Sequence, residues 1–256
     1  MKHTLVIGAG KSGQAAARFL LQKKIPVMLY DGKMQEPFAD SILDLQKRGV
    51  LLYMGGQNPP LQMLEQVIIS PGVPLQIPLV QEIIRNKIPL LGELEFAYQH
   101  AHNPFIAITG TNGKTTTTAL VGQMIKDAGL SSFVGGNIGT PLIDVVESLP
   151  QDATIVAEVS SFQLETTQNF KPRIGVILNI TPDHLDRHGN MENYIAAKAS
   201  IFARQNKNDD TILNYDDPIL RKLAASSPGR VVFFSRKEIL PQGVFVEDGK
   251  IVVGEN

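Results

Sequence analysis

The sequence contains no cysteine, so disulfide bonds and thiolate metal sites are excluded. No apolar stretch reaches the roughly 18 residues that a transmembrane helix needs, and Gly8 and Gly10 interrupt the run that a signal peptide would require. The 24 basic and 25 acidic residues leave a formal net charge of −1, which gives no general attraction to nucleic acid or to an anionic membrane. We therefore predict a cytoplasmic protein, expected to be a monomer, in which any phosphate site is local.

The chain has 256 residues, and 43% of them are hydrophobic, which is enough for one large domain or two smaller ones. Short apolar runs alternate with helical patterns, an order that predicts parallel strands and an α/β layer fold. In the first part we predict strands at residues 4–7, 26–30 and 67–70 and a helix at residues 12–23. A second unit is predicted to begin near Asn103-Pro104, which gives domains of residues 1–102 and 103–256.

The second unit repeats the alternation. Apolar strands are predicted at residues 105–109, 155–159, 174–179, 211–213 and 231–234, and a helix at residues 114–128. Near the end, two short apolar runs flank Asp248-Gly249, which is a hairpin signal. The last residues, Gly254-Glu255-Asn256, bring no capping helix, and we expect the chain to be cut from a longer one.

The most informative segment follows the strand at residues 105–109 and opens a helix. It reads Gly110-Thr-Asn-Gly113-Lys114-Thr115, in which glycines let backbone N–H groups turn toward a phosphate and the helix N-terminus adds partial positive charge. Lys114 could reach the β- and γ-phosphates of a nucleotide, and the Thr115 hydroxyl could bind Mg²⁺. The alternative is an ordinary glycine-rich turn. The predicted nucleotide contacts are Gly110, Thr111, Asn112, Gly113, Lys114, Thr115 and Thr116.

Charged residues follow two later strands, where open α/β sheets place their ligand sites. Glu158 lies in an apolar run and would need a cation, a salt bridge or a helix end to offset its charge. His184 stands beside Asp183 and Asp186 directly after a strand, so it is either structural or part of a charged cleft. Lys198 lies on a predicted helix and, taken alone, reads as a solvated lysine.

A second glycine motif, Gly8-Ala-Gly-Lys-Ser-Gly13, follows the first strand, and Asp31 ends the next one. This pattern predicts a helix N-terminus that accepts a diphosphate, from either a dinucleotide or a UDP-sugar. An NAD-dependent oxidoreductase is therefore one open alternative.

Three segments resemble the Mur ligases, and the resemblance extends over essentially the whole chain. They are the short phosphate loop, Ser160-Ser-Phe-Gln-Leu-Glu165 after Glu158, and Asn179–Arg187 with its Asp-His-Leu-Asp core. Among these ATP-dependent amide ligases, the two later strings and Ser70-Pro-Gly72 are most similar to the members that add D-glutamate. The resemblance implies a Rossmann-like first domain that holds the UDP part of the substrate. It also implies a P-loop-type ATP-binding central domain, incomplete here, and an absent amino-acid-binding domain.

In that family the residues matching Glu158 and His184 bind magnesium, and the lysine matching Lys198 is carbamylated and helps to hold a second metal. The resemblance therefore implies Thr115, Glu158, His184 and Lys198 as metal ligands, and Lys114, His184 and Lys198 as catalytic residues. Carbamylation needs an uncharged amine, so the site should depress the pKa of Lys198. The implied substrate contacts are Lys11, Ser12, Asp31, Lys33, Ser70, Gly72, Asn137, Ser160 and Gln163. The resemblance leads us to expect Thr-Arg near Gly32-Lys33. Lysine in place of arginine lacks the guanidinium group that can bind a phosphate through two hydrogen bonds, but it keeps the positive charge.

The implied reaction is ligation through an acyl phosphate. ATP would phosphorylate the carboxylate of UDP-N-acetylmuramoyl-L-alanine, and the amine of D-glutamate would displace the phosphate, with Lys114 and magnesium stabilising the transferring group. Because residues for D-glutamate are expected to be absent, we predict that this chain binds the UDP precursor without turning over. Another Mur ligase, a folylpolyglutamate synthase-like ligase and a non-catalytic nucleotide-binding module stay open as alternatives.

Overall fold

The computed structural model describes residues 2–33 and 36–254, which form two compact units. The first unit contains the chain up to Ala101 together with two later segments, Thr140–Ser148 and Thr166–Gln168. The second contains His102–Gly139, Leu149–Glu165 and the chain from Asn169 onward. Each unit is built on a mainly parallel sheet, so the predicted α/β class is confirmed. The domain boundary between residues 102 and 103 stays a prediction. The sequence did not indicate that two later segments belong to the first unit.

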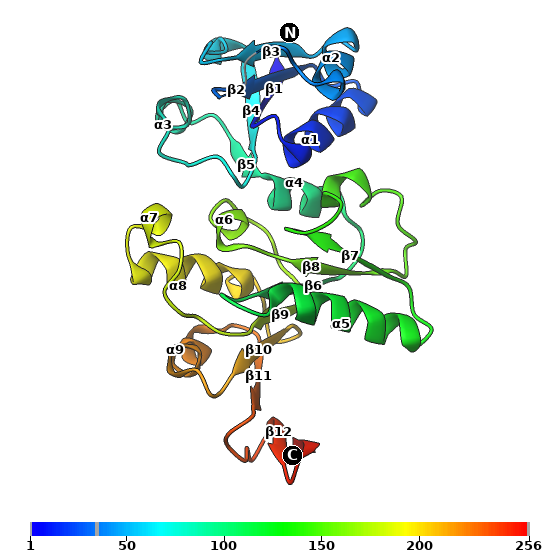
Figure 1. The fold of residues 1–256 in the computed structure, drawn as a ribbon, viewed down its shortest axis with the longest axis vertical. Coiled ribbons are helices and arrows are strands. Elements are labelled where there is room, and N and C mark those ends of the chain that lie inside the picture. The colour runs from blue at the N-terminus through cyan, green and yellow to red at the C-terminus, as the bar shows by residue number, and fades with distance from the viewer. Residues whose placement is uncertain (1, 34–35, 255–256) are drawn as a thin grey trace. The chain divides into compact units, whose positions relative to one another are not determined.

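A five-stranded parallel sheet in the order β3-β2-β1-β4-β5 forms the centre of the first unit (Figure 1). Its core is made of apolar strand residues and one face of helix α3, and Leu5, Met28 and Val67 are fully buried. The strands are β1 (His3–Ile7), β2 (Val27–Asp31), β3 (Leu51–Met54), β4 (Leu64–Ile69) and β5 (Leu90–Gly92). The helices are α1 (Lys11–Gln22), α2 (Asp40–Lys47), α3 (Pro78–Arg85), α4 (Glu93–His100) and the short 3₁₀ turns η1 (Leu61–Met63) and η2 (Leu142–Asp144).

The later segment around η2 is held in the first unit by charge and by apolar burial. Arg18 of α1 donates two hydrogen bonds to the carboxylate of Asp144, at 3.1 and 2.9 Å. Lys23 forms an ion pair with Glu147 at 2.6 Å, and Leu142 and Ile143 are buried. Since these ion pairs are half exposed, each contributes little, and the buried side chains account for most of the attachment.

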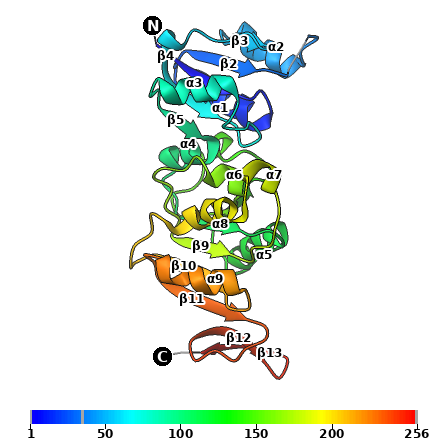
Figure 2. The same ribbon diagram turned by 90° about the vertical axis from the view of Figure 1, so that its left-hand side faces the viewer.

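The second unit has an eight-stranded sheet in the order β13-β12-β11-β10-β9-β6-β8-β7, in which only β12 and β13 pair antiparallel. Figure 2 shows the β12–β13 hairpin, near the C-terminus of the chain, at one edge of this sheet and next to β11. The strands are β6 (Phe105–Thr109), β7 (Ser132–Gly136), β8 (Thr154–Glu158), β9 (Ile174–Ile177), β10 (Asp210–Asn214), β11 (Arg230–Ser235), β12 (Gly243–Glu247) and β13 (Lys250–Gly254). The helices are α5 (Lys114–Asp127), α6 (Ser161–Leu164), α7 (Leu185–His188), α8 (Met191–Ala199), α9 (Pro218–Leu223) and the turns η3 (Ser200–Phe202) and η4 (Ala224–Ser226).

The strongest local patterns are confirmed. The helix predicted at residues 114–128 is α5, and the hairpin predicted around Asp248-Gly249 joins β12 to β13 with positive φ at both turn residues. The edge strands β3, β5 and β7 were not predicted, because they are short and carry little alternation. Gly254 lies in β13, and the rest of the predicted chain end, Glu255-Asn256, lies outside the described residues. No helix in the described part of the chain has the length and apolar character needed to cross a bilayer.

Candidate active site

The predicted phosphate loop connects β6 to α5, which places it at the carboxyl end of a central parallel strand. Gly113 has φ of +85° and precedes the first residue of α5, so a side chain there would be strained. The helix that follows is 14 residues long, and its first N–H groups have no partner within the helix. The loop therefore has the helix N-terminus that an anion site uses.

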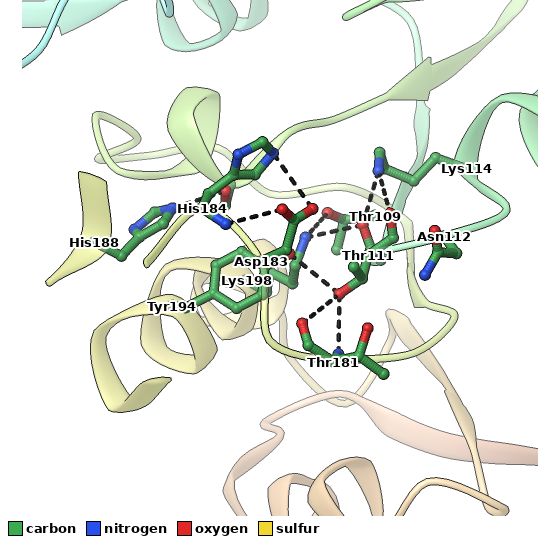
Figure 3. A network of polar contacts seen from close by, with 12 residues as sticks. Thr109, Thr111, Asn112, Lys114, Thr181, Asp183, His184, His188, Tyr194 and Lys198 are labelled. Atoms are coloured by element: carbon green, nitrogen blue, oxygen red, sulfur yellow. Dashed lines mark hydrogen bonds and ion pairs between the residues drawn. The ribbon is translucent and has the colours of Figure 1, made fainter. Parts of the chain in front are cut away.

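Two polar residues after β9 hold the loop in place. Asn179 accepts a hydrogen bond from the Asn112 N–H at 2.9 Å through its side-chain oxygen, and its side-chain nitrogen donates to the Asn112 carbonyl at 3.0 Å. The hydroxyl of Thr111 accepts from the Thr181 N–H at 3.0 Å and lies 3.1 Å from the Thr181 carbonyl (Figure 3). The loop is thus fixed by a segment about 70 residues away, a role that the sequence did not reveal for Asn179 or Thr181.

Lys114 lies across the loop that it follows. Its ammonium group donates to the carbonyl oxygens of Gly110 at 3.0 Å and Thr111 at 2.8 Å (Figure 3). The charge is therefore held at the N-terminus of α5, next to the backbone N–H groups. Thr116, also predicted to contact nucleotide, lies exposed in the first turn of the same helix.

Lys198 is buried on α8, with only 2% of its surface exposed, so the reading of a solvated lysine is wrong. Its ammonium donates to the Gly110 carbonyl at 2.9 Å and lies 4.7 Å from the centre of the Tyr194 ring. Burial, and next the nearby charge of Lys114, lower the pKa of Lys198 from 10.5 to about 7, against an opposing effect of Asp183. A substantial fraction of this amine is therefore uncharged near neutral pH.

Glu158 ends β8 and is 2% exposed, with both carboxylate oxygens in use. The Thr115 hydroxyl donates to one oxygen at 2.6 Å, and the side-chain amide of Asn137 donates to the other at 2.9 Å. A Cβ on Gly136 would lie 2.4 Å from the Glu158 carbonyl, so only glycine allows this approach. Asn137, predicted to contact substrate, therefore also orients Glu158, and two predicted metal ligands, Thr115 and Glu158, are in direct contact.

His184 has φ of +51°, an unusual backbone conformation for a histidine, and directly precedes the short helix α7. Its side chain is half exposed and lies 3.5 Å from the carboxylate of Asp183 (Figure 3). Among residues 2–33 and 36–254, no group of three or more His, Asp or Glu side chains is close enough to hold a metal ion. The metal roles of Thr115, Glu158, His184 and Lys198 therefore stay predictions.

A polar cluster that the sequence did not reveal ties α6 to α7. Both ring nitrogens of His188 have a partner. Nδ1 lies 3.0 Å from the carboxylate of Glu165, and Nε2 lies 2.9 Å from the Ser161 hydroxyl. Glu165 also accepts from Arg187 at 3.3 Å, and the Arg187 guanidinium lies 4.0 Å from the ring centre of Phe162. Burial lowers the pKa of His188 despite the opposing charge of Glu165. The cluster fixes the segment that carries His184, because His184 is only four residues from His188.

Ser160 and Gln163, both predicted to contact substrate, form a capping box at the start of α6. The Ser160 hydroxyl accepts from the Gln163 N–H at 3.2 Å, and the Gln163 side chain accepts from the Ser160 N–H at 2.9 Å. The Ser-x-x-Gln spacing could have revealed this role from the sequence. Their contact with substrate stays a prediction.

A pocket of about 530 Å³ adjoins the phosphate loop along the carboxyl ends of β9, β10 and β11. Thr181, which anchors the loop, lines it together with Asn214, Asp217 and Arg236. Asp217 is committed to structure, since it accepts from the Ile180 N–H at 2.8 Å and caps α9. The pocket therefore lies next to a residue that bonds the loop, at the sheet edge where α/β folds bind their ligands.

In the first unit, the glycine motif forms the predicted turn between β1 and α1. Asp31 accepts from the N–H of Ala9 at 3.0 Å and from the N–H of Lys33 at 3.0 Å, so its carboxylate shapes this turn. Ser70 donates a long hydrogen bond of 3.4 Å to the Gly8 carbonyl. The predicted substrate contacts Lys11, Lys33 and Gly72 are exposed, and Ser12 is partly buried.

Two protein families match the chain. The Mur ligase middle domain matches residues 108–243, and the MurD-like N-terminal domain of Mur ligases matches residues 2–92. The UDP-N-acetylmuramoylalanine–D-glutamate ligase of Pelotomaculum thermopropionicum is 52% identical over 257 residues, which cover 100% of this chain and 56% of that relative. The chain thus spans about half the length of the curated relative.

Solved structures share the fold at low sequence identity. The UDP-N-acetylmuramate:L-alanyl-gamma-D-glutamyl-meso-diaminopimelate ligase from Neisseria meningitides superposes with a TM-score of 0.60 at 18% identity, covering 98% of this chain and 86% of that one. The MurF ligase from Thermotoga maritima, solved in complex with ADP, gives 0.50 at 17% identity, covering 89% of this chain and 52% of that one. Since the Mur ligase middle domain alone matches more than half of the residues, the chain belongs to the Mur ligase family.

Proposed function

We propose that this chain is the part of a D-glutamate-adding Mur ligase that binds ATP and UDP-N-acetylmuramoyl-L-alanine. The observation that carries the proposal is the convergence of Lys114, Thr115, Glu158 and Lys198 on one phosphate loop. The name of the relative at 52% identity supports D-glutamate as the incoming amino acid. The ADP bound in the Thermotoga maritima MurF ligase supports a nucleotide in the shared fold.

The proposed reaction starts at the carboxylate of UDP-N-acetylmuramoyl-L-alanine. Its oxygen attacks the γ-phosphorus of ATP, ADP leaves, and an acyl phosphate forms. The amine of D-glutamate then attacks the acyl carbon, loses a proton and expels phosphate, which leaves the new amide. Activation is needed because a carboxylate is a poor electrophile. Lys114 and the N–H groups of the loop are suited to stabilise negative charge on the transferring phosphoryl group.

Magnesium fits the oxygen donors beside the loop. The hydroxyl of Thr115 and the carboxylate of Glu158 are hard ligands of the type that Mg²⁺ prefers, and they lie 2.6 Å apart. A carbamate on Lys198, formed when its neutral amine adds to CO2 with loss of a proton, would supply a further oxygen donor, and His184 completes the proposed set. When bound, the metal would neutralise charge on the phosphates.

The substrate half of the proposal is tested by titrating the chain with UDP-N-acetylmuramoyl-L-alanine in a calorimeter. UDP-N-acetylmuramate and NAD are the controls. We expect the alanyl precursor to bind, because the N-terminus of α1, which lies within the Gly8–Gly13 motif, is suited to accept a diphosphate, and Lys11 and Lys33 are exposed. Binding of NAD without a response to either UDP compound would replace the ligase proposal with an oxidoreductase.

The nucleotide half is tested by Lys114→Ala. We expect the affinity for ATP with magnesium to fall roughly tenfold to a hundredfold, the equivalent of one lost charge-assisted hydrogen bond. The matched control is Lys126→Ala, which removes an exposed lysine from the last turn of the same helix. Affinity for the UDP precursor should be unchanged in both variants. Equal ATP affinity in Lys114→Ala and Lys126→Ala would contradict the assignment of the loop.

A further inference from the structure

The phosphate loop contains the one Asn-Gly pair in the 256-residue sequence, Asn112-Gly113. We propose that Asn112 is a site of spontaneous deamidation that converts the loop into a form that binds nucleotide more weakly. Asparagine followed by glycine is chemically the most labile arrangement of an asparagine, because glycine has no Cβ to shield its own nitrogen. The structure adds three features of this pair that favour the same reaction.

The first feature is that both reacting groups are accessible. The Asn112 side chain is exposed, and among the described residues neither its amide group nor the N–H of Gly113 has a hydrogen-bond partner. Figure 3 shows the carboxamide of Asn112 standing apart from the bonded network of Thr111, Lys114 and Lys198. Neither of these two groups therefore has to leave a hydrogen-bond partner within the described residues before the Gly113 nitrogen approaches the side-chain carbonyl carbon.

The second feature is positive charge around the nitrogen that must lose its proton. Gly113 is the residue immediately before the 14-residue helix α5, where the helix dipole favours negative charge. The Lys114 ammonium lies 2.8 Å from the carbonyl oxygen of Thr111, on the peptide that precedes Asn112. Both charges lower the free energy of the deprotonated nitrogen and of the oxyanion that follows the attack.

The third feature is a hydrogen bond on the same peptide group. The side-chain nitrogen of Asn179 donates to the Asn112 carbonyl oxygen at 3.0 Å. This bond draws electron density from the peptide unit whose nitrogen belongs to Gly113, which makes that N–H more acidic. The opposing effect is that Asn179 also holds the Asn112 N–H at 2.9 Å, which restricts the rotation needed for attack.

The chemistry balances with water as its only co-reactant. The nitrogen of Gly113 attacks Cγ of Asn112, a C–N bond forms, and the side-chain nitrogen leaves as ammonia with the peptide proton. Water then opens the five-membered imide at either carbonyl, which gives aspartate or isoaspartate at position 112. Either product places a carboxylate in the loop, and isoaspartate also lengthens the backbone by one methylene group. If the loop binds phosphate as proposed, a negative charge at this position repels it.

The experiment incubates the chain in mildly alkaline buffer and follows each asparagine by peptide mass spectrometry over time. Asn208 is the internal reference, because it is also exposed but is followed by Asp209. We expect Asn112 to convert roughly tenfold faster than Asn208, because of the unshielded glycine nitrogen. An Asn112→Gln variant, whose ring closure is slower, should keep its phosphate-loop peptide unmodified under the same conditions. Conversion of Asn112 at or below the rate of Asn208 would overturn the proposal.

The predicted weakening of nucleotide binding rests on the proposed function, whereas deamidation itself does not. A parallel incubation with ATP and magnesium tests the two separately. Nucleotide phosphates would engage the N–H of Gly113, so the conversion of Asn112 should slow while that of Asn208 does not change. Rapid conversion of Asn112 that ATP does not slow would leave the deamidation site standing and would contradict nucleotide binding at the loop. The Asn112→Asp variant, which carries one of the two products, should show weakened ATP binding when titrated beside the parent chain.

Discussion

We expect the Lys198→Met variant to be at least as stable as the parent chain at about pH 6, where Lys198 is charged in the folded and in the unfolded state. We also expect this variant to lose a pH dependence of stability that the parent shows. The reason is that folding buries the ammonium group, which lowers the pKa of Lys198 to about 7 from 10.5. Methionine fills a similar volume without a charge. The Gly110 carbonyl keeps a partner, because Lys114 donates to it at 3.0 Å.

The sign of the pH dependence follows from proton counting. Below the folded pKa of about 7, both states carry the proton, and the folded state bears the full cost of a buried charge. Between about 7 and 10.5 the unfolded chain keeps a proton that the folded chain has released, so the stability of the parent rises with pH. With about 1.4 kcal/mol for each pKa unit, the rise across this window is a few kcal/mol.

Urea unfolding at a series of pH values, for the parent and for Lys198→Met, measures this difference. Lys126→Met is the matched control, because Lys126 is exposed on α5 and should leave the slope of the parent unchanged. Parallel pH profiles for the parent and Lys198→Met would contradict the depressed pKa. In buffer with carbon-13-labelled bicarbonate, the neutral amine of the parent should also give a carbamate signal that Lys198→Met lacks.

We expect the Gly13→Ala substitution to lower the free energy of unfolding of the first unit by about 3 kcal/mol or more. This is at or above the largest loss that is typical when extra atoms are forced into a packed core. A Cβ at this position would lie 1.7 Å from the carbonyl oxygen of Gly8 and 2.9 Å from its carbonyl carbon. Both atoms belong to the backbone at the end of β1, so no side-chain rotation can relieve the clash. Helix α1 would have to move away from the sheet, although alanine is otherwise favoured over glycine by about 1 kcal/mol inside a helix.

Gly10→Ala is the matched control for this substitution. It lies in the same glycine motif, but a Cβ there would meet no atom within 4 Å, and its φ of −72° is open to any residue. Thermal unfolding followed by circular dichroism should show a large loss for Gly13→Ala and a small one for Gly10→Ala. Binding of the UDP precursor should fall with Gly13→Ala at temperatures where the first unit begins to unfold. Equal unfolding temperatures for the two variants would show that α1 and β1 are not in the close contact described.

Features that depend on neighbouring residues could be predicted from the sequence. Strand, glycine turn and helix at residues 105–128 follow one another directly, so their apolar periodicity and the Gly-Lys-Thr order predict α5 and its loop. The Asp248-Gly249 hairpin is equally local, because the turn requires two positive φ values that these residues adopt. The α/β class follows from the same alternation.

Features that depend on residues far apart in the chain could not be predicted, because they arise only when the chain is folded. Lys198 reads as solvated on its own helix, and it is buried because α8 brings it to Gly110, 88 residues away. The anchoring of the loop by Asn179 and Thr181, and the attachment of Asp144 to Arg18 across 126 residues, arise in the same way. A sequence pattern records which faces are apolar, whereas the pKa of a lysine depends on the charges and burial that packing creates around it.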